Sequence, residues 1–229
     1  MIAAASCILV ARPAAAGLGY TLAVASDDRF RGATTSDGRA VATAALSIDD
    51  ASGLYAGVTL TAGIVRGEGV RVLSSVQQVG YVHRVDSAIS VDVGAVRRAY
   101  DRYATVEYGR RVAEVYAGLV SRRVSAHLFH APDYDGWGHA ATYLQLDGRP
   151  YERGALSLFA HVGALRPPRW QGGGRDVTAD WRLGATCRLD RAAALSLAWI
   201  GAGDGYDRYS ETRRTGARRA LVLSVSRAF

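Results

Sequence analysis

The sequence contains neither lysine nor asparagine, and it has only two cysteines, Cys7 and Cys187, and five prolines in 229 residues. Two cysteines exclude a disulfide framework and any zinc site built from cysteine. No apolar run reaches the roughly 18 residues that a membrane-spanning helix needs. A hydrophobic content of 49% excludes a disordered chain. All 28 basic side chains are arginine, and the 21 acidic ones leave a net charge of +7.

Glycine, valine, serine, threonine and tyrosine are abundant, and apolar and polar residues alternate over most of the chain after Tyr20. Alternation with period two, separated by turn residues, is typical of half-buried β-strands. The run Val76–Val79 interrupts the alternation and indicates either a β-bulge or a register error there. The pattern predicts twelve strands, near residues 19–26, 40–48, 54–64, 70–83, 88–97, 105–120, 124–131, 139–147, 155–165, 179–189, 193–200 and 219–229.

One face of the predicted strands is apolar and almost free of charge, as a lipid-facing band must be. The other face carries small residues, hydroxyls and occasional charges. Small residues suit a narrow lumen, where glycine leaves room for large neighbours such as Tyr55, Tyr116 and Tyr143. A soluble two-layer sandwich with the apolar face inside is the alternative. The glycines that share the polar parity are Gly57, Gly94, Gly118, Gly163 and Gly184.

The connections alternate in length. Long ones are expected at 27–39, 65–69, 98–104, 132–138, 166–178 and 201–218, and the others are tight turns except for 148–153. Long loops at one rim, tight turns at the other and both termini at the tight rim are typical of outer-membrane barrels. Trp181 and Trp199 would lie near the long-loop rim and Phe229 at the opposite rim. The sequence therefore predicts an all-β, up-and-down antiparallel transmembrane β-barrel of about twelve strands over residues 17–229, in the outer membrane of a Gram-negative bacterium.

Both ends of the chain carry export signals. Residues 2–10 are almost wholly apolar, and Ala14–Ala16 before Gly17 is typical of a cleavage site, so we expect a signal peptide over residues 1–16, without the usual positive start. A short hydrophobic first strand is the alternative. The last strand ends in Phe229 and is similar to the C-terminal signal that barrel assembly machinery recognises. Arg227 departs from that signal, but at the interface it can extend towards water.

The stretch from Ser26 to Gly32, Ser-Asp-Asp-Arg-Phe-Arg-Gly, followed by Ser36-Asp37-Gly38-Arg39, resembles the opening of a proteobacterial family of porin-like proteins, the TorF or Gcw-chp family. Asp28 and Ala40 depart from the family, which has an aromatic residue and a proline there. The resemblance implies an outer-membrane β-barrel with a channel role and no known substrate. Further matches are residues 52–57, 114–119, 132–134 and 180–184, and Tyr143.

Charged and aromatic side chains on the polar parity are candidates to line the lumen. An isolated charge in a narrow lumen would lose its hydration at a cost of several kcal/mol, so these groups should be paired. Two interpretations stay open: an ion-pair network that fills and stiffens the barrel, or a charged constriction that selects ions. The candidates are Asp92, Glu114, Tyr116, His127, Tyr143, His161, Asp180, Arg182 and Arg188.

Catalysis and cofactors are not expected. No serine lies in a nucleophile-elbow context, and a nucleophile needs a histidine in reach. Asp133 and Asp135 near His130 could form an acidic protease or metal site, but a solvated loop is the simpler interpretation. Gly172–Gly174 is not followed by the lysine of a phosphate loop and opens no helix. We therefore expect no enzyme, no cofactor and no metal site.

Arginines in or beside the predicted long loops suggest contact with lipopolysaccharide phosphates rather than nucleic acid, because guanidinium binds phosphate with two hydrogen bonds. A solvated loop surface is the alternative. The oligomeric state is not indicated. The residues concerned are Arg29, Arg31, Arg39, Arg66, Arg166, Arg169, Arg175, Arg208, Arg213, Arg214 and Arg218.

These patterns lead to one functional expectation: a porin-like barrel through which small solutes pass, with a preference for anions because arginine is in excess. The alternatives are a filled outer-membrane barrel with a structural or hydrolytic role on lipid or peptide, and a soluble ligand-binding barrel.

Overall fold

The computed structural model describes residues 17–106, 110–166, 177–203 and 219–229. The expected signal peptide at 1–16 lies outside the described residues. Among those described, no helix is long and apolar enough to cross a membrane. The strands are β1 (Gly17–Ala25), β2 (Arg29–Phe30), β3 (Ala33–Thr34), β4 (Val41–Asp49), β5 (Leu54–Val65), β6 (Gly69–Arg84), β7 (Ile89–Tyr100), β8 (Arg111–Ser121), β9 (Val124–Ala131), β10 (Ala141–Arg153), β11 (Leu156–Arg166), β12 (Thr178–Arg188), β13 (Ala193–Ala202) and β14 (Arg219–Ala228).

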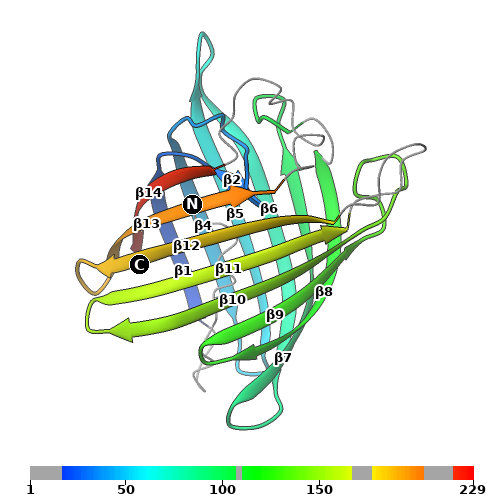
Figure 1. Cartoon of the computed structure of the whole chain (residues 1–229), viewed down its shortest axis with the longest axis vertical. Helices are drawn as coiled ribbons and strands as arrows, with labels where there is room; N and C mark the ends of the chain where they lie inside the picture. Colours follow the sequence, from blue (N-terminus) through cyan, green and yellow to red (C-terminus); the bar gives the residue numbers. More distant parts are fainter. Residues whose placement is uncertain (1–16, 107–109, 167–176, 204–218) are drawn as a thin grey trace.

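Twelve of these strands, β1 and β4–β14, form one closed antiparallel barrel (Figure 1). Each pairs with its sequence neighbours, and β1 pairs with β14 from Thr21 opposite Ala228 to Ala25 opposite Ser224. β2 and β3 form a separate small hairpin between β1 and β4. The prediction of a single up-and-down barrel with twelve strands is confirmed. In Figure 1 the strands β10–β13 run across those of β4–β7 on the opposite wall.

Three strand limits differ from those expected. β8 begins at Arg111 rather than near residue 105. Residues 148–153, expected as a longer turn, belong to β10, which has a bulge between Gly148 and Tyr151. The bulge contains Pro150, which has no N–H to donate to a neighbouring strand. The bulge expected at Val76–Val79 lies instead at Leu73, where the register shifts between Thr61 and Ala62 of β5.

The orientation of the strands follows the apolar parity. Leu156, Leu158 and Val162 of β11 are 42%, 39% and 54% exposed, and they face outwards. Residues on the other parity, such as Leu165 and Gly163, face the interior. Hence the apolar face is the outer one, and the alternative of a soluble sandwich with these residues inside is wrong.

The inner face is crowded by aromatic rings that lie over glycines. A β-carbon on Gly163 would lie 2.0 Å from the Tyr143 hydroxyl, and one on Gly94 would lie 2.4 Å from the Tyr116 hydroxyl. Gly118 and Gly184 leave the same kind of space for His127 and Phe159. Gly57 differs, because only a backbone oxygen lies near its missing β-carbon. These close approaches explain why small residues share the polar parity.

Replacing Gly163 by valine should destabilise the barrel, because the new side chain must displace Tyr143. Overpacking of this kind costs about 1–3 kcal/mol. Urea-induced unfolding in detergent micelles measures the change. The control is Ala160→Val on the same strand, whose side chain faces outwards. Equal stability of the two variants would contradict the packing argument.

Candidate functional site: the lumen and its inward loop

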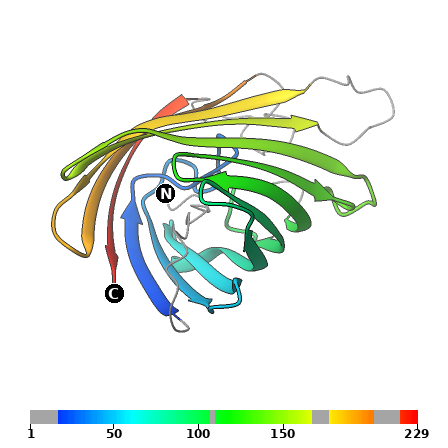
Figure 2. The same ribbon diagram turned by 90° about the horizontal axis from the view of Figure 1, so that it is seen from below.

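The segment between β1 and β4, residues 26–40, folds into the barrel rather than out from the rim. We call it the inward loop. Ser36 is 0% exposed, and Arg29 and Arg31 are 5% and 7% exposed. Figure 2 shows this segment, in blue, within the ring of strands. The expectation that Arg29 and Arg31 contact lipopolysaccharide is wrong, because both are buried inside the barrel.

Asp27 organises the inward loop. Its carboxylate accepts hydrogen bonds from Arg29 Nε at 2.6 Å, Thr34 Oγ1 at 2.7 Å, Ser36 Oγ at 2.8 Å and the Gly38 backbone N–H at 3.2 Å. Charge-assisted hydrogen bonds of this kind are about twice as strong as neutral ones. The residues that carry the family resemblance are therefore those that hold this loop together.

Arg31 joins the inward loop to the barrel wall. Its Nη2 lies 2.5 Å from Glu114 Oε1 on β8, and its guanidinium lies 3.9 Å from the centre of the Tyr143 ring on β10. Arg98 on β7 lies 3.9 Å from the other oxygen of Glu114. Gly32 follows with a φ of 81°, and a β-carbon there would lie 2.5 Å from the Gly201 carbonyl oxygen. Only glycine fits this approach to β13.

Rim loops cover the inward loop from the long-loop side. Thr105 donates its backbone N–H to the Thr35 oxygen at 3.0 Å and its hydroxyl to the Thr34 oxygen at 2.9 Å. The half-buried Arg39 donates from Nη2 to the backbone carbonyl oxygen of Tyr103 at 3.2 Å. Tyr134, in the loop between β9 and β10, packs its ring 5.8 Å from the Arg31 guanidinium. The inward loop thus lies between the rim loops and the lumen.

Two carboxylates in these loops show how the surroundings act on charge. Burial raises the pKa of Asp28, although a hydrogen bond from Thr35 offsets part of this. Burial also acts to raise the pKa of Asp135, but hydrogen bonds from Trp137 and His139 outweigh it and leave that pKa lowered. Asp135 accepts from the Trp137 N–H at 2.9 Å and pairs with His139 at 2.6 Å. These contacts are local to the loop.

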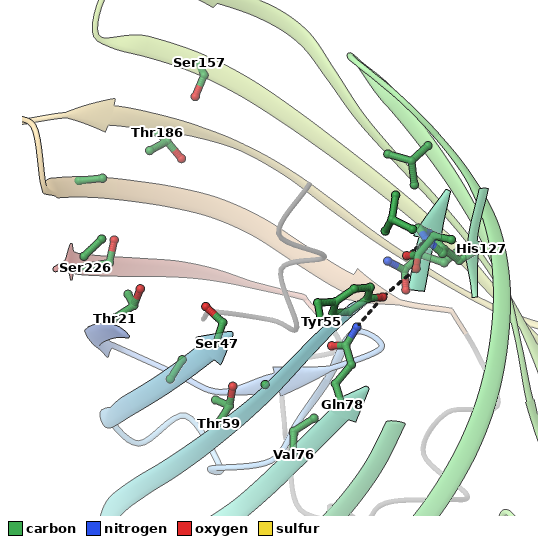
Figure 3. Close-up of a pocket in the computed structure, with 18 of the residues that line it drawn as sticks. Thr21, Ser47, Tyr55, Thr59, Val76, Gln78, His127, Ser157, Thr186 and Ser226 are labelled. Carbon is green, nitrogen blue, oxygen red and sulfur yellow. Dashed lines mark hydrogen bonds and ion pairs between the residues drawn. The ribbon is translucent and has the colours of Figure 1, made fainter. Parts of the chain in front are cut away.

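A first polar cluster lies on β5–β9. His127 Nε2 lies 3.0 Å from Asp92 Oδ2, and the Tyr55 hydroxyl donates to Asp92 Oδ1 at 2.7 Å. Tyr55 and Tyr116 share a hydrogen bond, and Gln78 donates to Tyr116 at 3.0 Å. Figure 3 shows Tyr55, Gln78 and His127 meeting at one side of the cavity. Both carboxylate oxygens of Asp92 therefore have a partner.

A second polar cluster lies on β10–β12. His161 sits between two carboxylates, with Nδ1 2.9 Å from Asp147 and Nε2 3.0 Å from Asp180. The Tyr143 hydroxyl donates to Asp180 at 3.1 Å. Arg182 lies 3.9 Å from Asp147. Both inner-wall clusters thus combine acids with histidine or arginine.

Below the inward loop is a cavity of about 1160 Å³, which extends to the short-turn rim. Hydroxyl groups line much of it (Figure 3). At the rim, five arginines outnumber three acids along its lining. The hydroxyl-bearing residues include Thr21, Ser47, Thr59, Ser157, Thr186 and Ser226, and the charged rim residues are Arg84, Arg122, Arg123, Arg188, Arg191, Asp86, Glu152 and Asp190.

The structure places all nine predicted lumen residues on the inner face. Glu114 joins the inward loop, and Asp92, Tyr116 and His127 meet in the first cluster. Tyr143, His161, Asp180 and Arg182 meet in the second. Arg188 stands apart at the short-turn rim, where it donates to the Gly154 oxygen at 2.7 Å.

Sequence reasoning missed the inward loop and its partners. Arg98 and Asp147 did not stand out, and Asp27 and Arg31 were not assigned to the lumen, because a strand pattern cannot show which loop turns inwards. The one signal available was the dense polar motif at Ser26–Gly32. Residues 133–139 form a locally hydrogen-bonded loop, and the described part of the chain holds no group of three metal-binding side chains.

Residues 11–229 match the model of a family described as "Bacterial protein of unknown function (Gcw_chp)", so the chain belongs to that family. A search of curated proteins gives no match.

Solved structures show the same fold. The KdgM porin is similar with a TM-score of 0.55 and 9% identity, over 94% of this chain and 99% of that one. The NanC porin is similar with a TM-score of 0.57 and 9% identity, over 92% of this chain and 99% of that one. The COG4313 outer membrane channel from Pseudomonas putida F1 is similar with a TM-score of 0.53 and 15% identity, over 96% of this chain and 97% of that one. The chain thus has the fold of outer-membrane porins.

Replacing Arg31 by alanine should destabilise the protein, because it leaves Glu114 buried with only the distant Arg98. Removing one partner of a buried pair costs about 3–5 kcal/mol. The triple variant Arg31→Met/Arg98→Met/Glu114→Met, which removes all three buried charges, should recover much of the loss. Unfolding in detergent measures both, with Arg66→Ala on an exposed rim loop as the control. A loss in Arg31→Ala no larger than in the control would disprove the anchoring role.

Proposed function

We propose that this protein is an outer-membrane channel for small solutes, in which the inward loop sets the narrowest point. The observation that carries the proposal is the hydroxyl-lined cavity of about 1160 Å³ inside a closed barrel, which ends at the inward loop. An apolar outer band and a polar lumen are the general design of such channels. The similarity to porin structures supports it.

The lumen suits polar solutes. Serine and threonine hydroxyls both donate and accept hydrogen bonds, so they can replace part of the hydration of a passing molecule. The KdgM porin, which has a similar fold, is described in complex with oligogalacturonate, an acidic sugar chain. We propose small polar solutes, with anions preferred, for this chain.

The inward loop also supports the rival proposal of a filled barrel with a structural role. Its contacts reach β7, β8, β10 and β13, so it spans the lumen. A channel then requires either a gap beside the loop or its displacement. No nucleophile or metal centre lies in the described lumen clusters, so a hydrolytic role has less support.

The cellular setting is part of the same proposal. Export through the leader at residues 1–16 and assembly by recognition of the last strand would place the barrel in the outer membrane. The Phe229 ring is 54% exposed and stacks on Tyr20 at 4.7 Å, which leaves it accessible at the short-turn rim. Long loops would then face outwards from the cell.

Replacing residues 29–38 by a short glycine-serine linker should enlarge the conductance several-fold, because it removes the loop that ends the cavity. Single-channel recording in planar bilayers measures the step size. The matched control replaces the exposed hairpin tip at residues 66–68. If the loop variant conducts and the wild type does not, the inward loop fills the wild-type barrel and the structural role is the correct proposal.

At low salt the channel should prefer anions, because arginines outnumber acids at the short-turn mouth and Glu114 is paired with Arg31. The preference should fade towards 1 M salt, where the Debye length is about 3 Å. Reversal potentials in a KCl gradient measure it. Arg182→Ala should weaken the preference by leaving Asp147 with less positive charge nearby. A cation preference of the wild type at low salt would disprove this prediction.

A further inference from the structure

Acidic side chains on the barrel strands lie on the inner face only, whereas arginines lie on both faces. All six strand carboxylates face the interior. Four of them are described above: Asp92 in the first polar cluster, Asp147 and Asp180 in the second, and Glu114 in its pair with Arg31. Asp49 lies opposite the inward-facing Tyr55, and Glu152 lines the cavity. The charged residues on the outer parity of the described strands are arginines. The outer face therefore has a cationic character wherever it is charged.

Three of these outward arginines lie at the long-loop rim. Arg97 shares the parity of Val93 on β7, Arg111 that of Val115 on β8, and Arg166 that of Val162 on β11. Arg111 is the first residue of its strand and Arg166 the last, while Arg97 lies three residues from the end of its own. All three are exposed. All three lie towards the long-loop end of the outer face.

The three arginines lie in two neighbouring groups on the outer face, because His130 is opposite Val115, four residues along β8 from Arg111. Arg97 pairs across the ladder with Ala113, so it is a diagonal neighbour of Arg111, about 7–8 Å away. His130, Thr142 and Arg166 stand in one row on β9, β10 and β11. Neighbouring strands lie about 5 Å apart, so this row spans about 10 Å. We call Arg97, Arg111, His130, Thr142 and Arg166 the outer rim patch.

None of these three arginines has an ion-pair partner among the residues that the structure describes. Other arginines near the rims differ. Arg71 pairs with Glu68, and the guanidinium groups of Arg219 and Arg227 lie over the rings of Trp181 and Phe229 at 5.6 and 5.5 Å. His130 Nδ1 lies 3.2 Å from Thr142 Oγ1. The patch thus offers unpaired guanidinium groups beside polar side chains.

We infer that the outer rim patch binds lipopolysaccharide through its headgroup phosphates. A lipid-facing arginine at the membrane surface is stabilised by an anionic headgroup, and guanidinium binds phosphate with two parallel hydrogen bonds. The inference rests on the outer-membrane location proposed above, in which the long-loop rim meets the outer leaflet. It does not depend on whether the lumen conducts. The lipid contact is thus assigned to exposed arginines of the outer wall and not to Arg29 and Arg31, which are buried in the inward loop.

The test measures binding of purified lipopolysaccharide to the delipidated, refolded barrel in detergent. Each headgroup arginine is worth about 1 kcal/mol, or about fivefold in affinity, so Arg97→Gln/Arg111→Gln/Arg166→Gln should bind about a hundredfold more weakly. The control Arg149→Gln/Arg153→Gln/Arg227→Gln removes the same charge from the opposite rim, and should bind as the wild type does. Retained heat-modifiable migration on electrophoresis shows that each variant is folded.

Two further ligands identify what is recognised. Dephosphorylated lipopolysaccharide should bind the wild type as weakly as the intact lipid binds the rim variant. Inorganic phosphate at millimolar concentration should displace little of the intact lipid, since it lacks the acyl chains that the apolar band contacts. Equal loss in the control and rim variants, unchanged binding in the rim variant, or full displacement by inorganic phosphate would overturn the inference. Single-channel recording of the rim variant should give the wild-type conductance, which separates this result from the channel proposal.

Discussion

The barrel depends on one constraint, that every backbone N–H and C=O group within a membrane must find a partner in the protein. Pairing of β1 with β14 meets this constraint by removing both sheet edges. Closure then gives every strand an outer and an inner face. Each charged group on a strand must either face the enclosed lumen or lie at a rim, and the described strands follow this division.

Enclosure of the acids creates the need for internal counter-charges. Glu114 is buried within the barrel, and it is compensated from outside its own strand by Arg31 of the inward loop and Arg98 of β7. His161 lies between Asp147 and Asp180, with one ring nitrogen against each carboxylate. The ion-pair network and the constriction, which were alternatives at the level of sequence, share the same residues. The pair that holds the loop also determines how much of the lumen stays open.

The two faces of the barrel give different roles to one residue type. Arginine in the lumen is paired with acids and lies over aromatic rings, as Arg31 does against Glu114 and Tyr143. Arginine on the outer wall near the long-loop rim has no such partners in the described structure. A chain with no lysine therefore uses guanidinium both for internal anchoring and, in our inference, for contact with lipid phosphates.

The sequence by itself determined the barrel, because a side-chain period of two is a local property of the strand. Leu158 and His161 differ in parity, and that difference alone assigned one to lipid and the other to the lumen. Turn residues in the same way located most strand ends. Residues 148–153, which include Pro150, were expected as a turn but form a bulged end of β10. Only the tertiary structure decided where residues 26–40 lie. The pairing of Arg31 with Glu114 joins positions 83 residues apart, and no local pattern encodes which loop enters the lumen, since that depends on the charges and space that the closed barrel provides.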